Sequence, residues 1–536
     1  MKILKKFLVL ALVGIMVVSA SACGMKREGG NVDTKNYDLV IKYFSGAYGD
    51  DWIQKAAKEF EKEKGIKVQT IPSSEMDCGA ENNLTANKNL ADIYIGSSDR
   101  WESWVQNGYI ENLKTVYEST VKTSKGDVKV SDYIAPEVVG RAYIERQVGT
   151  GDSYPWIVPF TSMPMSLAYN ADALKKIPHV SSTAVSAESV DPATNKWIAP
   201  PKNLTEWLSL CDDINAYKSD DGHKYVPFGW TALATEQVYY FMFTWWAQYQ
   251  GLFESNVAGQ GSFYDFWNFG NTSKTTLNQT LSSRVFEQKG IAVSLDGFKK
   301  LVIDPKTQSY KNSLSAVNSL TTQELTRALY AERNEERPVI AFASSFGEAE
   351  AKLTGVFDSN SDGKQDSNIL FMNIPALDGH ENEKYLYCAI DDFMFVPSGI
   401  EKERKDLAKE FLVFLCNEDQ LKKFTVRSGG GIRPFAYDAR AIEDKSLTAY
   451  NKSVFDVYYN STKIYDFPLK AYQESPFAVS LVHTYEGPIV FASLGTSSAV
   501  NMLKKTDGAE VMKEVKRLFD VSKSNYIKKY RMTEVK

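Results

Sequence analysis

After residue 36 the chain alternates short apolar runs with an amphipathic segment. Leu39 to Phe44 is apolar, and a turn is expected at Gly46 to Gly49. In the next segment apolar residues recur with the i, i+3, i+4, i+7 spacing of one helix face, and Gly65 follows its end. These apolar residues are Ile53, Ala56, Ala57 and Phe60. A second apolar run, Ile66 to Ile71, completes a strand, helix, strand pattern, which predicts a parallel sheet covered by helices.

The same rhythm returns along the chain. Further strands are predicted at residues 91–95, 157–160, 166–169, 369–374 and 394–397. One helix is predicted to begin within residues 200–207, and another to run through Leu407, Phe411, Phe414 and Leu415. Beyond about residue 436 the pattern is mostly helical. The fold class predicted from these patterns is α/β.

The first residues have the pattern of a secretory signal. Basic residues precede an apolar run from Phe7 to Val18, and small residues lead to Cys23. Ala20 to Cys23 resembles a bacterial lipobox, although Leu is usual where this chain has Ala20. We therefore expect residues 1–22 to be a signal peptide, Cys23 to be lipidated, and residues 23–36 to tether the folded part to the cell membrane. Ordinary signal cleavage with an idle Cys23 thiol is the alternative.

Charge and cysteine content narrow the class of partner. The full chain has 62 basic and 67 acidic residues, and removal of residues 1–22 takes away three lysines, which leaves 59 basic residues and a net charge of about −8. The two signs are interleaved, so nucleic acid is not expected as a partner. Four cysteines remain after Cys23, too scattered for a disulfide scaffold or a zinc site. A hydrophobic content of 43% over this length is enough for two large cores.

Six segments, in order, resemble those of the family 1 extracellular solute-binding proteins, which include sugar-binding proteins of ABC importers. They are Leu90 to Ile93, Gly108 to Leu113, Val158 to Leu174, Pro201 to Trp207, Arg337 to Phe342 and Leu407 to Leu415. Within them, Leu167-Ala168-Tyr169-Asn170 resembles the family's "l-x-Y-N" and Pro201 to Trp207 its "P-x-T-W-x-E" helix start, with Leu204 where Trp is frequent. The resemblance covers nearly the whole chain after the tether.

The resemblance implies a two-lobed periplasmic-binding-protein-like fold of type II, with hinge strands between α/β lobes. We place the N-terminal lobe at residues 37–158 and 393–436, and the C-terminal lobe at residues 159–392 and 437–536. The implied function is to capture a carbohydrate, expected to be an oligosaccharide, in a cleft between lobes that close on it, and to present it to the permease of an ABC importer. No catalysis is expected, and the protein is expected to be a monomer outside the cytoplasm.

A sugar site requires flat aromatic rings bordered by polar side chains. Candidates are aromatic and polar residues at predicted strand ends, at the crossing between lobes, or in regions where the resemblance places ligand contacts. They are Tyr48, Asp50, Asp51, Asp99, Arg100, Trp101, Trp156, Thr161, Trp230, Trp245, Phe346, Asp391 and Asp392. For each of them the alternative is an ordinary cap or a packed core side chain.

Two other functions stay open. A glycosidase needs only two carboxylates, which come from distant positions, so spacing does not exclude it. Other catalytic signatures are absent, because the four histidines are far apart and neither His-Glu-x-x-His nor Gly-x-Ser-x-Gly occurs. A binding protein for a peptide or polyamine would need an acidic site, for which Asp99 and Asp391-Asp392 are available.

One loop has the spacing of a calcium site. From Asp358 onward, oxygen side chains stand at positions 1, 3, 5 and 9, with Gly at position 6. The candidate ligands are Asp358, Asn360, Asp362, Lys364 and Asp366. Position 12 is Ile369 rather than Glu, which excludes a complete EF-hand. The hypothesis is a structural calcium ion, and the alternative is a solvated turn.

Overall fold

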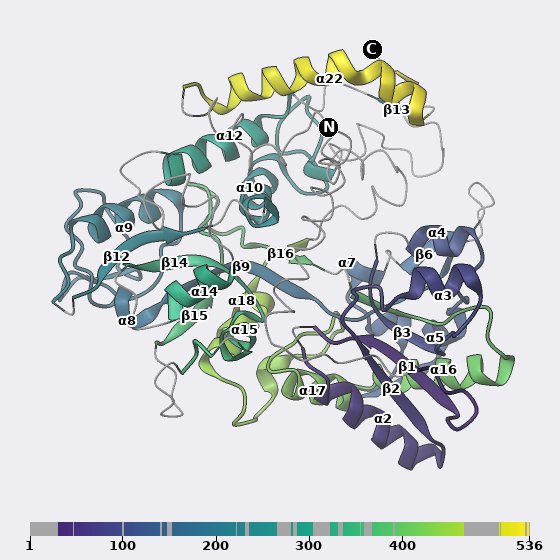
Figure 1. Ribbon diagram of the computed structural model, residues 1–536. Coiled ribbons are helices and arrows are strands. Elements are labelled where there is room, and N and C mark those ends of the chain that lie inside the picture. The colour runs from purple at the N-terminus through teal and green to yellow at the C-terminus, as the bar shows by residue number, and fades with distance from the viewer. Residues whose placement is uncertain are drawn as a thin grey trace, which may run out of the picture. The chain divides into compact units, whose positions relative to one another are not determined.

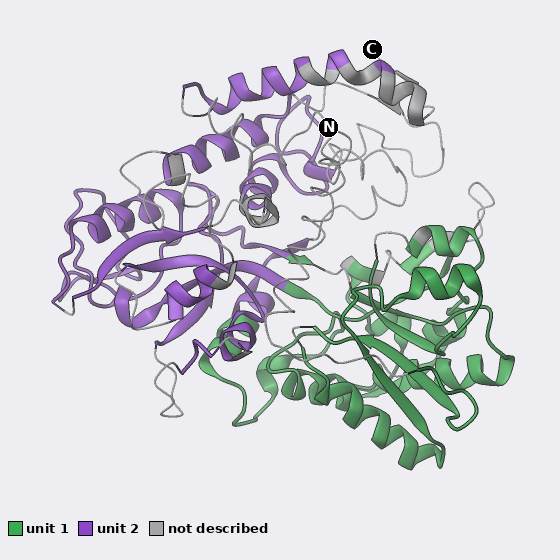
Figure 2. Ribbon diagram, viewed as in Figure 1, with its two compact units in different colours: residues 1–163, 388–455 green, residues 164–387, 456–536 purple. Residues whose placement is uncertain are grey.

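The structure is a computed structural model. It describes residues 31–46, 48–98, 101–139, 142–146, 153–220, 222–230, 235–264, 280–281, 287–303, 322–330, 336–353, 355–358, 367–389, 392–465, 503, 505–530 and 533–534. The chain forms two compact units (Figures 1 and 2). Unit 1 comprises residues 1–163 and 388–455, and unit 2 comprises residues 164–387 and 456–536. The chain therefore passes between the units three times.

These divisions differ from the lobe boundaries placed from the sequence, at 158/159, 392/393 and 436/437. Residues 159–163 stay with unit 1 because the Phe160 amide donates to the Asp392 carbonyl at 2.9 Å and the Ser162 amide donates to the Ile432 carbonyl at 2.9 Å. The last boundary lies at 455/456 instead of 436/437. The side-chain amide of Asn451 donates to the Gly429 carbonyl at 2.8 Å, which holds the start of helix α18 (Ala449–Asn460) to unit 1.

Unit 1 is built on a five-stranded sheet of order β2-β1-β3-β17-β8. The strands are β1 (Leu39–Phe44), β2 (Val68–Ser73), β3 (Ile93–Ser97), β8 (Val158–Pro159) and β17 (Asp392–Phe395). β1 is parallel to β2 and β3, whereas β17 is antiparallel to β3 and to β8. The predicted strand, helix, strand unit is confirmed, with the second strand two residues later than expected.

Helix α2 (Asp51–Lys64) connects β1 and β2, and it ends where Gly65 adopts a left-handed conformation with φ 69°. Its apolar face, including Ile53 and Phe60, is buried as the i, i+3, i+4 pattern predicts. The Phe60 ring packs at 5.1 Å from the ring of Phe411 on α16 (Lys402–Leu415). The helix predicted through Phe411 is thereby confirmed, and it covers the same core as α2.

The remaining elements of unit 1 are short or peripheral. They are α3 (Ala80–Ala86), α4 (Trp101–Gln106), α5 (Lys114–Glu118), β4 (Thr120–Thr123), β5 (Gly126–Lys129), α6 (Val130–Tyr133), α7 (Pro136–Val139), β6 (Tyr143–Glu145), β7 (Ser153–Pro155), α17 (Glu418–Arg427) and the 3-10 turn Ala439–Ala441. Helix α18 (Ala449–Asn460) begins in unit 1 and ends in unit 2.

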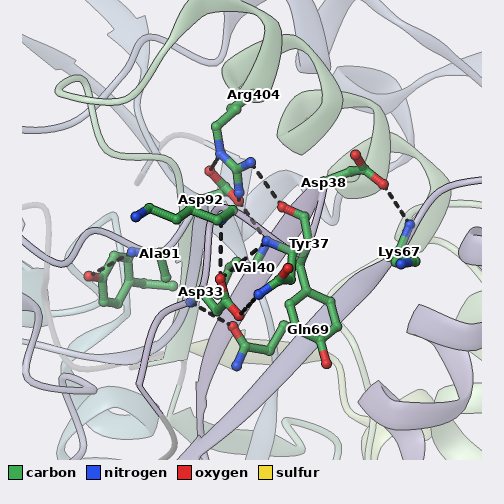
Figure 3. A network of polar contacts seen from close by, with 12 residues as sticks. Asp33, Tyr37, Asp38, Val40, Lys67, Gln69, Ala91, Asp92 and Arg404 are labelled. Atoms are coloured by element: carbon green, nitrogen blue, oxygen red, sulfur yellow. Dashed lines mark hydrogen bonds and ion pairs between the residues drawn. The ribbon is translucent and has the colours of Figure 1, made fainter.

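A buried ion pair joins α16 to the sheet (Figure 3). The Asp92 side chain is fully buried and accepts from Arg404 Nε at 2.7 Å and from the Val40 amide at 2.6 Å. Arg404 Nη1 also donates to the Tyr37 carbonyl at 3.1 Å. Burial raises the pKa of Asp92, and the hydrogen bonds and charge of Arg404 oppose that rise. Asp92 therefore depends on Arg404 to remain charged inside the fold.

Unit 2 has a six-stranded sheet of order β12-β14-β9-β16-β18, with β15 also pairing with β9. Its strands are β9 (Met163–Asn170), β12 (Lys224–Gly229), β14 (Glu336–Ser344), β15 (Ile369–Met372), β16 (Tyr385–Ala389) and β18 (Lys463–Tyr465). β12 is parallel to β14, and β14 is antiparallel to β9. The strands predicted near residues 166–169 and 369–374 are confirmed as β9 and β15.

The other elements of unit 2 lie between the strands of its sheet or after them in the chain. They are α8 (Ala171–Leu174), β10 (Val190–Asp191), β11 (Lys196–Trp197), α9 (Leu204–Ala216), α10 (Thr235–Gln250), β13 (Thr280–Leu281), α12 (Lys289–Phe298), the π-helical turn Lys299–Ile303, α14 (Thr322–Tyr330), α15 (Gly347–Leu353), α22 (Gly508–Tyr530) and β19 (Thr533–Glu534). In Figure 1, α22 lies alongside α12. Helix α9 starts after Asn203, whose side chain accepts from the Glu206 amide, a cap that the sequence does not single out.

Candidate ligand-binding site

The edge of the unit 1 sheet at the carboxyl ends of β1, β2 and β3 gathers residues that are far apart in sequence. Phe44 at the end of β1 pairs with Ser73 at the end of β2. Asp392, at the start of antiparallel β17, pairs with Ser97 at the end of β3. Open α/β sheets bind their ligands beside the carboxyl ends of strands, so this edge is the candidate site of unit 1.

Four aromatic rings cluster at this edge. The Trp52 and Phe160 rings lie 4.7 Å apart between centroids, and Phe424 of α17 lies 5.2 Å from each of them. Tyr48 is 5.7 Å from Phe424 and 6.4 Å from Phe160. Trp52, Phe160 and Phe424 are buried, whereas Tyr48 is half-buried. Tyr48 is therefore the residue of this cluster with the most exposed surface, although its hydroxyl oxygen is buried.

Polar groups stand next to this cluster. Thr161, which is fully buried, lies with Oγ1 3.2 Å from Asp392 Oδ2. The hydroxyl of the neighbouring Ser162 is buried and has no hydrogen-bond partner within the described part of the chain. A buried hydroxyl without a partner is energetically unfavourable by about 1–3 kcal/mol, which a ligand oxygen or a water molecule would recover.

Arg433 fixes the position of Phe160. Its side chain is buried, Nε donates to the Phe160 carbonyl at 3.2 Å, and Nη1 donates to the Leu415 carbonyl at 2.6 Å. The guanidinium carbon also lies 5.7 Å from the centre of the Phe160 ring and 4.9 Å from that of Phe435. Burial lowers the pKa of Arg433. The sequence shows this residue only as part of a glycine-rich loop, and its role emerges from the fold.

The other candidates of unit 1 lie in ordinary structural surroundings. Asp50 accepts from the Ser45 hydroxyl at 2.5 Å and makes no side-chain cap bond, although it stands at the helix N-cap. Asp51 is exposed and pairs with Lys55 at 2.7 Å. Trp101 is buried with its ring 5.8 Å from that of Phe393, and Trp156 is also buried. Among these candidates, only Asp50 contacts Ser45, the residue that directly follows β1.

In unit 2, two candidates follow neighbouring parallel strands. Trp230 comes directly after β12, and Phe346 comes shortly after β14. Trp230 is buried edge-on to Phe298 at 5.4 Å, and its Nε1 has no hydrogen-bond partner among the described residues. Phe346 is half-buried. The buried hydroxyl of Ser345, beside Phe346, likewise lacks a partner in the described chain.

Trp245 lies in the core of unit 2. It is fully buried on α10, its Nε1 donates to the Pro375 carbonyl at 2.8 Å, and its ring packs against Trp207 at 6.5 Å. A Cβ added at Gly297 of α12 would stand 2.5 Å from a Trp245 ring carbon, so α12 packs directly on the ring. The Trp245 indole is thus packed and hydrogen-bonded within the core. This is the packed core side chain that the sequence leaves open as the alternative to a ligand contact.

Several candidates lie outside the described residues. They are Asp99, Arg100, Asp391, Cys23 and the loop residues Asn360, Asp362, Lys364 and Asp366. Among the described residues, no group of three or more His, Cys, Asp or Glu could hold a metal ion. The calcium hypothesis is not tested by that observation, because the described part includes only Asp358 of the candidate loop.

The four described cysteines, Cys78, Cys211, Cys388 and Cys416, are buried free thiols. Burial raises the pKa of Cys416 to about 11. Burial also raises the pKa values of Cys78 and Cys211, so these three thiols are protonated at neutral pH and act as core side chains. Within the described ranges, no helix combines the length and apolar character needed to cross a membrane.

A search of curated proteins gives no match. Among solved structures, a probable secreted solute-binding lipoprotein from Streptomyces coelicolor is 14% identical, over 91% of this chain and 99% of that chain, with a TM-score of 0.56. RafE in complex with raffinose is 12% identical, over 90% and 100% of the two chains, with a TM-score of 0.53. Maltose-bound MalE3 of T. maritima is 12% identical, over 90% and 99%, with a TM-score of 0.54.

At these identities the likeness shows the fold, which is that of two-lobed periplasmic binding proteins. The family model described as bacterial extracellular solute-binding protein matches residues 46–422, most of the chain. All six segments that carry the sequence resemblance fall inside that range. This chain therefore belongs to the bacterial extracellular solute-binding proteins, as its sequence resemblance predicts.

Proposed function

We propose that this chain is the substrate-binding component of an ABC importer and that its ligand is a carbohydrate, most simply an oligosaccharide. The observation that carries the proposal is the carboxyl edge of the unit 1 sheet, where the half-buried residue Tyr48 borders an aromatic cluster next to Thr161 and Asp392. A sugar offers C–H faces that stack on rings, and hydroxyls that bond to carboxylate and hydroxyl side chains.

The family and its solved relatives support the same ligand class. Among the similar solved proteins are binders of raffinose, maltose, chitin oligosaccharide and β-D-galactopyranose. Their identities to this chain are 11–12%, which is too low to transfer a particular sugar. The proposal therefore extends to the carbohydrate class and not to one linkage.

The remaining parts of the proposal follow from the sequence. The protein acts as a monomer outside the cytoplasm, is held at the cell membrane by a lipid on Cys23, and delivers its ligand to a membrane permease. Binding is accompanied by closure of the two lobes rather than by turnover. Small-angle X-ray scattering tests closure, because the radius of gyration is expected to fall when the ligand is added, and an unchanged scattering profile at saturation contradicts it.

Calorimetry on a glycan panel tests the ligand class. The panel includes maltose, raffinose, galactose, xylo-oligosaccharides and chitin oligosaccharides, with peptides and polyamines as the competing class. We expect saturable binding of at least one saccharide, with no product detectable by chromatography. Product formation would instead identify a glycosidase, and binding of only peptides or polyamines would overturn the carbohydrate proposal.

A matched pair of variants locates the site. Tyr48→Ala removes the Tyr48 ring from the unit 1 edge and is expected to weaken saccharide binding by about tenfold or more. Tyr217→Ala removes a half-buried tyrosine of unit 2, stacked on Tyr225 at 6.1 Å, and is expected to leave the affinity unchanged. Equal affinities of the two variants would place the ligand elsewhere.

A further inference from the structure

Lys42 is a charged residue on a central strand. It lies in β1, which pairs with β2 on one side and β3 on the other, opposite Ile71 and Tyr94. Its side chain is half-buried and has no ion pair or hydrogen bond within the described residues, whereas most central strand positions around it are buried and apolar. A half-buried ammonium group without a partner has lost part of its hydration, so a ligand that accepts a hydrogen bond would bind there favourably.

The loop after β2 brings Glu75 to this lysine. The Glu75 amide donates to the Ser73 hydroxyl at 3.2 Å. Further along, the Ser97 amide donates to the Met76 carbonyl at 2.9 Å, and the Cys78 thiol contacts the Ile95 carbonyl at 3.2 Å. The loop is therefore fastened to the end of β3, at the edge where Ser97 pairs with Asp392.

Gly79 shows how close the two charged groups are. A Cβ added at Gly79 would lie 2.9 Å from Glu75 Oε2 and 3.4 Å from Lys42 Nζ. Both charged groups thus border the same small space, yet they form no ion pair within 4.0 Å in the described structure. Gly79 has φ 65°, a left-handed conformation that glycine adopts without strain, so its lack of a side chain keeps this space open.

Electrostatics agrees with this placement. Burial raises the pKa of Cys78, and the charges of Lys42, Asp77, Asp392 and Glu75 all act on that thiol. Lys42 and Asp392 therefore both lie near Cys78, which contacts the end of β3. Asp77 accepts from the Gly79 amide at 2.8 Å and is occupied within the loop, whereas the Glu75 side chain is exposed.

The chemistry of the pair selects a ligand group. An ammonium group only donates hydrogen bonds and an ionised carboxylate only accepts them, while a hydroxyl does both. We propose that Lys42 and Glu75 together bind one hydroxyl of the carbohydrate, whose oxygen accepts from Lys42 Nζ and whose proton is donated to a Glu75 carboxylate oxygen. This inference rests on the proposed function and makes the pair a specificity determinant for that hydroxyl.

Calorimetry tests the proposal with the best-binding saccharide of the panel and its monodeoxy analogues. Lys42→Met and Glu75→Gln are each expected to weaken binding by about 10- to 100-fold, the range for a hydrogen bond to a charged group. The double variant is expected to bind no more than a few-fold more weakly than the worse single variant, because either change already loses the shared hydroxyl. Lys58→Met, on the exposed face of α2, serves as the control and is expected to bind like wild type.

The monodeoxy analogues identify the hydroxyl. One of them should bind wild type about 10- to 100-fold more weakly than the parent sugar, yet bind Lys42→Met as well as the parent does. Thermal melting checks that each variant is folded. If Lys42→Met does not fold, Lys42→Arg takes its place; because arginine keeps a donor, this variant should retain most of the wild-type affinity.

The outcomes separate this proposal from the proposed function. Saccharide binding by wild type that persists unchanged in Lys42→Met and Glu75→Gln overturns the hydroxyl pair and leaves the carbohydrate function intact. Failure of wild type to bind any saccharide of the panel overturns both. If the fold-losses in affinity of the two single variants multiply in the double variant, the two residues act independently, and this result also contradicts a shared hydroxyl.

Discussion

Thr161 Oγ1 lies 3.2 Å from Asp392 Oδ2, although the two residues are 231 positions apart in the sequence. Thr161 follows β8 and Asp392 begins β17, so the contact joins two segments that adjoin passages of the chain between the units. The hydroxyl donates to the carboxylate, and the Phe160 amide donates to the Asp392 carbonyl at 2.9 Å. Both polar candidates and the Phe160 ring are thereby held at one edge of the unit 1 sheet.

Replacing Thr161 by Val removes the hydroxyl from a fully buried position at nearly constant volume. The change is expected to lower the stability of unit 1 by about 1–2 kcal/mol, because the Asp392 carboxylate loses a donor. Urea unfolding followed by circular dichroism measures the effect. Thr161→Ser keeps the hydroxyl and should lie closer to wild type, and a Thr161→Val variant as stable as wild type would show that the hydrogen bond to Asp392 contributes nothing.

The Asp92 and Arg404 pair allows a test of buried charge. Arg404→Met leaves the fully buried Asp92 carboxylate without its guanidinium partner, and a loss of about 3–5 kcal/mol is expected. Thermal and urea unfolding measure the loss. The double variant Asp92→Asn with Arg404→Met should recover part of it, since no charge then remains buried. A double variant less stable than Arg404→Met would contradict this account.

The pKa of Glu59 predicts how the stability of unit 1 changes in acid. Burial raises the pKa of this residue, but hydrogen bonds from Lys423, Arg427 and Gln420 of α17 outweigh burial and lower it from 4.5 to about 2. Since the folded pKa is below the unfolded one, the carboxylate stabilises the fold above pH 4.5, and this contribution is lost as the pH falls from 4.5 toward 2.

Glu59→Gln should therefore destabilise the protein by about 1–2 kcal/mol at pH 7, a value reduced by partial solvent exposure of the pair. The stabilities of the variant and of wild type should converge near pH 2. Urea unfolding across this pH range measures the difference. A constant difference from pH 7 to pH 2 would show that the ionised form of Glu59 contributes nothing.

The loop that begins at Asp358 is tested by chelation. A structural calcium ion predicts one bound calcium per chain by elemental analysis and a melting temperature that falls in EDTA and recovers when calcium is added back. Magnesium added back in place of calcium is the control and should not restore the melting temperature. An unchanged melting temperature together with no bound calcium would establish the solvated turn.

The lipid on Cys23 is tested by Cys23→Ala. Wild type is expected in the membrane fraction and labelled by a palmitate analogue, whereas the variant should be released and unlabelled, since the diacylated cysteine is the anchor. Immunoblots of fractionated cells measure the distribution. A released and unlabelled wild-type protein would support ordinary signal cleavage.

Much of the fold was predictable because it depends on local pattern. The apolar face of α2, the stop at Gly65, and the strands β1, β3 and β9 follow from residue spacing within a few positions. The lobe boundaries differ from those placed from the sequence, because hydrogen bonds such as that from Ser162 to Ile432 join segments that lie far apart along the chain.

The site was less predictable. Tyr48 and Thr161 could be chosen because each follows a predicted strand, but no local signal separates the core side chain Trp245 from a ligand platform, since both are aromatic residues in an aromatic run. Trp52 and Phe424 were missed for the opposite reason. Each occupies an apolar helix position, and only their ring contacts with Phe160 reveal the cluster.

The sequence by itself determined the α/β class, the order of strands and helices and the family resemblance, because these depend on neighbouring residues and on short segments in order. Only the tertiary structure decided that Lys42 and Glu75 border the same space beside Gly79 and that Arg433 supports Phe160. Those relations depend on strand register and on the packing of segments tens to hundreds of residues apart, and side-chain contacts at that range leave no periodic trace in the chain.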